Sequence, residues 1–318
     1  MLKTIAIYIR LLICSFLILN CFACEKEISI DIGNHEPKIV INAVFQGGKN
    51  WNVSVHQSKN VLSPEPHVNL DEAIVRITER KSGRNYLLKS IGEGIYTSKF
   101  ELVKSGIDYK IDVSYPGLKS VHAYANAPDP IEAKITYSEI FHYNGKTALR
   151  VDFEIFDDPN NSNFYIYEIL NLFPEAPTDP NTTPFLTSPI KSWLSSVDGN
   201  TGYITDATEK QSKLFVTDNN FRGSILNTSL ISFVEIKELG KEPSNEIDES
   251  LYIPDFSKSK LKVTVASKEL FEYYKILELF IQKRALNSSI TTPIKPYSNI
   301  ENGLGVFAGY NSIILSLE

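Results

Sequence analysis

The chain has little cysteine, methionine and tryptophan. Among its 318 residues there are 3 cysteines, 1 methionine and 2 tryptophans. The cysteines are Cys14, Cys21 and Cys24, so all of them lie near the N-terminus. Cleavage before Cys24 leaves a single thiol, and we therefore expect no intrachain disulfide in the mature chain. Its stability must then come from the burial of apolar surface.

The sequence also lacks an excess of positive charge. Its net charge is −6. Removal of residues 1–23 takes away Lys3, Arg10 and no acidic residue, so the mature chain carries two fewer positive charges and a net charge of −8. An acidic chain without lysine and arginine clusters argues against binding to nucleic acid and against electrostatic adhesion to anionic lipid.

Long hydrophobic runs are missing as well. The most apolar segment near the N-terminus, Leu11–Leu19, is broken only by Cys14 and Ser15. It is shorter than the roughly 20 apolar residues that a spanning helix needs. Because Lys3 and Arg10 precede it, the order of charge and apolar residues predicts a secretory signal peptide over residues 1–23.

Cys24 is the predicted site of lipidation. A cysteine at the first mature position can carry lipid on its thiol and its amine, and two or more acyl chains anchor a protein firmly. The segment resembles the lipobox of bacterial lipoproteins, although Cys21 and Phe22 stand where leucine and a small residue are usual. Cys21 is the rival acceptor. An ordinary signal peptide or an uncleaved N-terminal anchor would also fit the order of charge and apolar residues.

Residues 24–37 are expected to form a lipidated tether. Glu25, Lys26 and Glu27 follow Cys24 and resemble the signal that directs lipoproteins of Bacteroidota to the outer face of the outer membrane. A solvated charged linker is the alternative interpretation. The predicted location is the outer membrane, with the lipid-anchored protein facing the extracellular side.

Aromatic residues are abundant, and apolar residues mostly alternate with polar ones. The chain contains 16 tyrosines and 17 phenylalanines, which pair well across β-strands. About seven short alternating segments between residues 38 and 127, separated by turn residues, predict an immunoglobulin-like β-sandwich. Two of the alternating series are Trp51, Val53 and Val55, and Tyr109, Ile111, Val113 and Tyr115.

A second β domain, either a sandwich or an open barrel, is predicted over residues 128–318. Pro128 and Pro130 mark the boundary because proline ends a strand ladder. One large β domain is the alternative. Within the second region, Ser267 can cap a helix over about 267–286. Apolar residues recur along that helix at helical spacing, namely Leu270, Tyr274, Leu277 and Ile281. The predicted fold class is therefore mainly β with one C-terminal helix.

A long loop is expected between residues 173 and 203. The stretch 173–192 contains five prolines and little periodicity. The aromatic residues Phe185, Trp193 and Tyr203 are candidates for binding, because exposed aromatic rings can stack on sugars or anchor a protein partner. Packing of these rings against the sheet beneath is the alternative.

The sequence contains no recognisable catalytic or metal-binding motif. Its histidines are scattered, at His35, His56, His67, His122 and His142. The acidic and amide residues of 157–163 could line a calcium loop, but they lack its spacing and closing glutamate, and a turn is the preferred interpretation. We therefore predict no enzyme activity, no cofactor and no metal.

A series of short motifs over nearly the whole mature chain resembles the DUF4249 family of Bacteroidota outer-membrane lipoproteins. The motifs are Cys24-Glu25-Lys26-Glu27-Ile28, Lys38-Ile39-Val40-Ile41-Asn42, Gly94-Ile95-Tyr96, Gly106-Ile107-Asp108-Tyr109, Asp158-Pro159, Asn163-Phe164-Tyr165, Tyr297-Ser298-Asn299-Ile300 and Gly303-Leu304-Gly305-Val306-Phe307. The resemblance implies a surface lipoprotein, often encoded beside TonB-dependent receptors. It implies no catalytic residue.

Three functions remain open from the sequence. The leading hypothesis is an accessory or ligand-capture partner of a TonB-dependent uptake receptor, held to the outer membrane through lipid on Cys24. The alternative is a structural or adhesive cell-surface protein. The third is an extracellular hydrolase with an unrecognised site, because glycosidase carboxylate pairs leave no characteristic sequence spacing.

Overall fold

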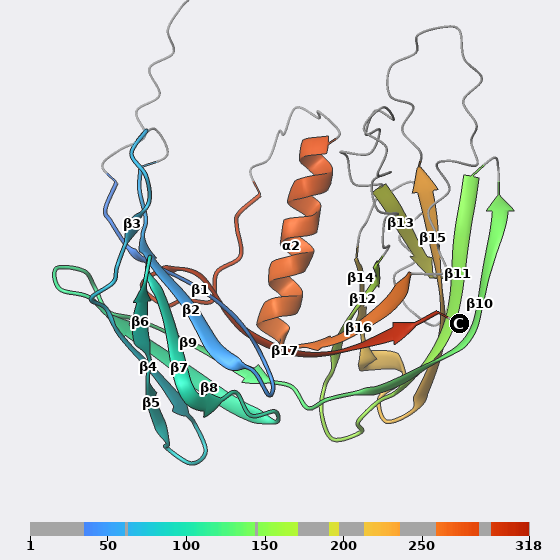
Figure 1. The fold of residues 1–318 in the computed structure, drawn as a ribbon, viewed down its shortest axis with the longest axis horizontal. Coiled ribbons are helices and arrows are strands. Elements are labelled where there is room, and N and C mark those ends of the chain that lie inside the picture. The colour runs from blue at the N-terminus through green and yellow to red at the C-terminus, as the bar shows by residue number, and fades with distance from the viewer. Residues whose placement is uncertain are drawn as a thin grey trace, which may run out of the picture. The chain divides into compact units, whose positions relative to one another are not determined.

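The computed structural model describes residues 35–60, 63–143, 146–170, 191–196, 213–235, 259–285 and 294–317. The predicted signal peptide, Cys24 and the charged residues after it lie outside these ranges. Residues 37–318 form one compact unit. Its described part contains three β-sheets and one α-helix near the C-terminus, which confirms the predicted mainly β class (Figure 1).

Strands make up most of the residues that the structure describes. Those before residue 128 are β1 (Ile39–Gln46), β2 (Asn50–Gln57), β3 (Val68–Asn69), β4 (Ile74–Glu79), β5 (Asn85–Leu87), β6 (Lys89–Gly92), β7 (Ile95–Leu102), β8 (Ile107–Ser114) and β9 (Val121–Ala127). The elements after it are β10 (Glu132–Tyr143), β11 (Lys146–Phe156), β12 (Phe164–Leu170), β13 (Lys191–Ser196), β14 (Leu214–Thr217), the short 3₁₀ turn η1 (Asp218–Asn220), β15 (Ile225–Glu235), β16 (Lys260–Ala266), α2 (Lys268–Ala285) and β17 (Leu304–Ser316).

The alternation read from the first half of the sequence is confirmed. The three alternating apolar residues of β2 are fully buried, and Tyr109, Ile111 and Val113 of β8 are buried to nearly the same degree. Tyr115 lies after the end of β8 and is only partly buried. Both sets belong to a first core, in which the rings of Trp51 and Tyr109 meet edge to face with centroids 4.9 Å apart. Phe307 lies in this core too, 4.8 Å from Phe45. The last strand therefore helps to complete the N-terminal core.

One sheet continues across the predicted domain boundary at residues 127 and 128. Its main path has the strand order β14-β12-β16-β17-β1-β2-β7-β6, and β3 pairs with β2 beside it. The last strand, β17, lies in the middle, parallel to β1 and antiparallel to β16. The other two sheets have the orders β5-β4-β8-β9 and β10-β11-β15-β13. The boundary itself stays a prediction, and β17 connects the regions on its two sides.

The side chains of β17 contribute to both cores. On one face Phe307 lies in the first core, whereas Ile313 and Leu315 pack against the second. Asn311 lies between them on the same face and is buried. Its amide donates to the carbonyl oxygen of Pro128 at 2.5 Å and to Ser105 Oγ at 2.9 Å. The hydrogen-bonded side chain of Asn311 therefore lies on β17 between the first core and the second core.

The second core contains the alternating apolar residues that the sequence predicted for β11. The alternating residues of β11 are buried, namely Leu149, Val151, Phe153 and Ile155. The polar segment that follows is a turn. Asp157 accepts hydrogen bonds from the Asn163 amide at 3.0 Å, from the Gly223 backbone at 2.7 Å and from the Tyr165 hydroxyl. Its carboxylate is thus occupied by N–H and O–H donors, as the turn interpretation requires.

The helix α2 lies within the predicted range, and Ser267 precedes it. The Leu270 backbone N–H donates to Ser267 Oγ at 3.3 Å, as expected for an N-cap. Leu270 and Phe271 are buried against β12, β16 and β17. The predicted apolar stripe is only partly correct, because Leu277 and Ile281 are 37% and 51% exposed. The first part of the helix thus packs more deeply on the sheet than the part that follows.

Glu79, the last residue of β4, has a buried carboxylate. Glu79 accepts hydrogen bonds from Lys104 Nζ at 2.8 Å, from Ser82 Oγ at 2.6 Å and from the Tyr86 hydroxyl. Burial by itself would raise the pKa of Glu79. The three hydrogen bonds and the charge of Lys104 outweigh burial and lower that pKa to about 2. Glu79 is therefore ionised in the folded chain.

This depressed pKa predicts a loss of stability in acid. The folded-state pKa of Glu79 lies below its ordinary value of 4.5, so its contribution is complete above about pH 5 and disappears as the pH falls toward 2. Glu79→Gln should lower the free energy of unfolding at pH 7 by about 1.5–3 kcal/mol, the usual value of hydrogen bonds to a charged group. Urea unfolding at pH 7 and pH 3 checks this. The free energy of unfolding should change less between pH 7 and pH 3 in the variant than in the unaltered protein. An equal change in both proteins would contradict the role assigned to Glu79.

Candidate ligand site

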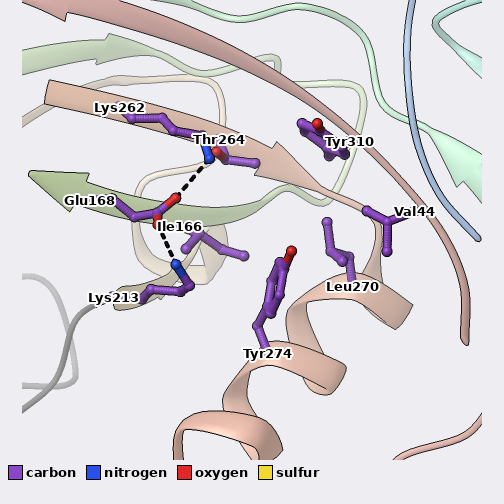
Figure 2. A pocket seen from close by; sticks show the side chains of 9 residues that line it. All are labelled: Val44, Ile166, Glu168, Lys213, Lys262, Thr264, Leu270, Tyr274 and Tyr310. Atoms are coloured by element: carbon purple, nitrogen blue, oxygen red, sulfur yellow. Dashed lines mark hydrogen bonds and ion pairs between the residues drawn. The ribbon is translucent and has the colours of Figure 1, made fainter. Parts of the chain in front are cut away.

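Three charged residues meet on the face of the large sheet that α2 covers. Glu168 lies on β12, directly opposite Lys262 of the neighbouring strand β16. Lys213 comes immediately before β14, which pairs with β12 on its other side. Lys262 Nζ lies 2.9 Å from one carboxylate oxygen of Glu168, and Lys213 Nζ is paired with the other. The strand order β14-β12-β16 therefore places one carboxylate between two ammonium groups (Figure 2).

Glu168 is held in its ionised form. Burial would raise the pKa of this carboxyl group, but the hydrogen bonds and charges of Lys213 and Lys262 lower it overall. With both lysines protonated, the three groups together carry one net positive charge. The cluster is thus able to attract a singly charged anion.

The three groups line one end of a small cavity. Its volume is about 90 Å³. Figure 2 shows Glu168, Lys213 and Lys262 toward one end, and Val44 and Leu270 toward the other. The cavity thus presents a charged end and an apolar end to whatever enters it.

Two tyrosines and the helix complete the wall. Tyr274 projects from α2 toward the sheet, and Tyr310 comes from β17 (Figure 2). The ammonium group of Lys213 lies 5.5 Å from the centre of the Tyr274 ring. Burial, followed by the nearby Glu168 charge, raises the pKa of Tyr274. Its hydroxyl therefore stays protonated at neutral pH and is able to donate a hydrogen bond.

One polar atom in the wall, the Thr264 hydroxyl, has no hydrogen-bond partner in the described part of the chain. Thr264 is 4% exposed, and within the described residues its hydroxyl makes no hydrogen bond. An unpaired buried hydroxyl costs about 1–3 kcal/mol. Thr264 lies two residues along β16 from Lys262, so both side chains are on the same face of the strand. A ligand that reached the lysines could also satisfy this hydroxyl.

The structure describes only one of the three binding residues predicted from sequence. Phe185 and Tyr203 are outside the described residues. Trp193 is on the strand β13, in register with Phe233 of β15, so the prediction of a continuous loop through residue 193 is wrong there. The strand forms because β15 supplies the partner for its backbone, and that pairing leaves no local sequence pattern.

The residues of the pocket were not predicted. Lys262 stands among alternating apolar residues, a pattern that equally describes the solvent face of a strand. Glu168 is the one charged residue in the apolar and aromatic run of β12. The only available signal was that charged residues recur on the faces of β12 and β16 opposite the second core. Sequence alone does not indicate that α2 covers those faces.

Two kinds of chemistry receive no support from this arrangement. Within the ranges that the structure describes, no three His, Cys, Asp or Glu side chains are grouped to hold a metal ion. The carboxylate of the pocket is ion-paired, whereas the acid of a glycosidase needs a raised pKa and a second carboxylate nearby.

The described part of the chain also contains no helix with the length and apolar character needed to cross a membrane.

The fold and the site together define a mainly β protein with a charged pocket between a sheet and a helix. Residues 25–313 match the family described as Domain of unknown function (DUF4249), and the chain belongs to this family. None of the curated proteins matches it. Among solved structures, it is similar to a protein from Bacteroides uniformis ATCC 8492 for which carbohydrate binding has been proposed. The identity is 7% over 88% of this chain and 98% of that one, and the TM-score is 0.17.

Proposed function

We propose that the protein is an outer-membrane lipoprotein that captures a ligand for a TonB-dependent uptake receptor. The observation that carries ligand capture is the pocket, where two lysines surround one carboxylate beside an unpaired buried hydroxyl. The lipid anchor at Cys24 and the extracellular orientation are supported by the apolar N-terminal segment and by the charged residues that follow it. The receptor is the partner that the family resemblance implies.

The proposed role is binding without catalysis. The two lysines hold the carboxylate of Glu168 in its charged form, so it is poorly suited to donate a proton. The apolar end of the cavity offers contact surface to a ligand but no reactive group. The charged and hydroxyl groups of this pocket converge beside Val44, Ile166 and Leu270, and convergent polar groups of this kind fix the orientation of a ligand.

We also propose that the N-terminal region is an immunoglobulin-like sandwich. The strands β1-β2-β7-β6 and β5-β4-β8-β9 pack on one shared core, an arrangement similar to the ABED and CFG sheets of that fold. Tyr109 lies near the start of β8. Its hydroxyl accepts from the Lys104 backbone N–H at 2.9 Å and lies 3.2 Å from the Lys104 carbonyl oxygen. This contact resembles the tyrosine corner of immunoglobulin domains.

Co-purification tests the uptake hypothesis. The native protein, tagged at its C-terminus, is isolated from gently solubilised outer membranes, and its companions are identified by mass spectrometry. We expect a TonB-dependent β-barrel in a constant ratio to the lipoprotein. A control mixes membranes that contain the tagged protein with membranes from untagged cells after lysis, so that contacts formed in detergent are recognised. Recovery of the lipoprotein alone would contradict the proposal and favour a structural or adhesive role.

A further inference from the structure

We propose that the pocket between α2 and the large sheet binds the carboxylate group of an organic acid. This ligand class belongs to the site described above and rests on the proposed capture function. Three properties of the pocket support it: its charge, its two unlike ends and its hydrogen-bond donors.

Charge is the first reason. Lys213 and Lys262 share a single carboxylate, and the three groups carry one net positive charge. A carboxylate of charge −1 neutralises the cluster. Inorganic phosphate carries more than one negative charge at neutral pH and would leave an excess negative charge, because the described lining of the pocket contains no third cation. Buried charges that remain unbalanced are strongly unfavourable.

The apolar end is the second reason. Val44, Ile166 and Leu270 line the cavity, and Figure 2 shows Val44 and Leu270 at the end away from the lysines. An organic acid has carbon atoms to place against these side chains, whereas an inorganic anion has none. The volume of about 90 Å³ has room for several water-sized groups, since one water needs about 10–15 Å³. The site thus fits a short acid or the acidic end of a larger molecule.

The donors are the third reason. An ionised carboxylate accepts hydrogen bonds only. The pocket offers the ammonium groups of both lysines and the hydroxyls of Tyr274, Tyr310 and Thr264. Among the described residues the Thr264 hydroxyl has no hydrogen-bond partner, so a bound carboxylate removes the cost of this unpaired group in addition to forming a new contact.

Direct titration tests the proposal without the receptor. The full-length protein, purified in detergent, is titrated with ¹³C-labelled propionate and followed by ligand-observed NMR, with empty micelles as the blank. Lys262→Met and Lys213→Met should each weaken propionate binding about tenfold or more, because each removes a charge-assisted hydrogen bond. Lys260→Met is the matched control. Lys260 lies on the same face of β16 as Lys262 but outside the pocket, and its loss should leave the affinity unchanged.

A second pair of variants separates binding from folding. Thr264→Val removes the unpaired hydroxyl while keeping the shape of the side chain, so the free protein should be at least as stable and propionate binding should be weaker. Thr228→Val is its control, because Thr228 on β15 is also buried with an unpaired hydroxyl but does not line the pocket. Its effect on propionate affinity should be nil.

The possible outcomes are distinct. Propionate binding that depends on the two lysines and Thr264 but not on the control positions supports the proposal. Tighter binding of inorganic phosphate, or equal binding of neutral propionamide, overturns the carboxylate assignment. So does propionate binding that the pocket variants do not change, or no binding at all. In each of these cases the co-purified receptor is still observed if the accessory role is correct, so the two hypotheses fail separately.

Discussion

Replacing Cys24 with alanine is expected to remove nearly all of the protein from the outer-membrane fraction. The acidic mature chain has no basic cluster that could hold it on anionic lipid, so attachment depends on the acyl chains. Each buried methylene contributes about 0.8 kcal/mol, and loss of two or three chains removes the whole anchor. Membrane fractionation and the intact mass of the protein measure the result.

Cys21→Ala is the matched control for this prediction. Cys21 is the rival acceptor three residues earlier, and its replacement should leave both the acylated mass and the membrane fraction unchanged. The reverse result, with Cys21→Ala released and Cys24→Ala retained, would move the lipid to Cys21. Retention of both variants with no acyl mass would instead favour an uncleaved N-terminal anchor.

The second large effect is expected from Gly305→Ala. Gly305 pairs with Ile41 where β17 runs parallel to β1, and its φ of +104° is a conformation that residues with a Cβ rarely adopt. A Cβ at this position would overlap the carbonyl oxygen of Ile41. Backbone strain of about 1–2 kcal/mol and overpacking of about 1–3 kcal/mol combine at one site. Since a domain is stable by only about 5–15 kcal/mol, we expect a sharply reduced yield of folded protein.

Gly117→Ala separates the two causes. Gly117 also has a positive φ, +81°, but nothing lies near the position of its Cβ. The free energy of unfolding of this variant should fall only by the cost of backbone strain, about 1–2 kcal/mol, and the protein should remain folded. Urea unfolding of both variants gives the comparison. Equal losses at the two positions would mean that the close approach of β17 to Ile41 is unimportant for stability.

Local pattern predicted the elements of this fold well. The alternating residues of β2, β8 and β11 are buried because a strand with one face on a core needs period-two burial. The helix α2 was predicted because its N-cap and its apolar spacing are both local properties. These features depend on neighbours a few residues away, so the sequence shows them directly.

Pairings between distant segments could not be predicted. Nothing local in residues 304–316 indicates that β17 lies beside β1 rather than at a sheet edge. The strand β13 was missed for the same reason, since its existence depends on β15. The pocket also depends on long-range pairing, because Glu168 and Lys262 become neighbours only when β12 and β16 join. Site prediction failed where strand order, not strand existence, determines which residues meet.

The family motifs have structural roles at the positions described. The side chain of Asn299 accepts from the Phe307 backbone N–H at 3.0 Å and donates to the Phe307 carbonyl oxygen at 2.8 Å. Two hydrogen bonds thus join the motif of residues 297–300 to the motif of residues 303–307. The hydroxyl of Tyr96 in another motif donates to the Leu70 carbonyl oxygen at 2.5 Å. These residues fix turns and strand ends, and none of them lines the pocket.

The central place of β17 has a consequence for the order of folding. Val40 pairs with Leu304, so closing the first core requires a contact between opposite ends of the chain. The two strands are far apart in the sequence, so this contact has a high contact order. The chain loses conformational entropy when it closes the long loop, before the packing of the core compensates for that loss. The short hairpins of the N-terminal half are expected to form early, but they leave the edge of β1 uncovered until β17 pairs with it. The N-terminal half is therefore expected to fold at the rate of the longest closure in the molecule.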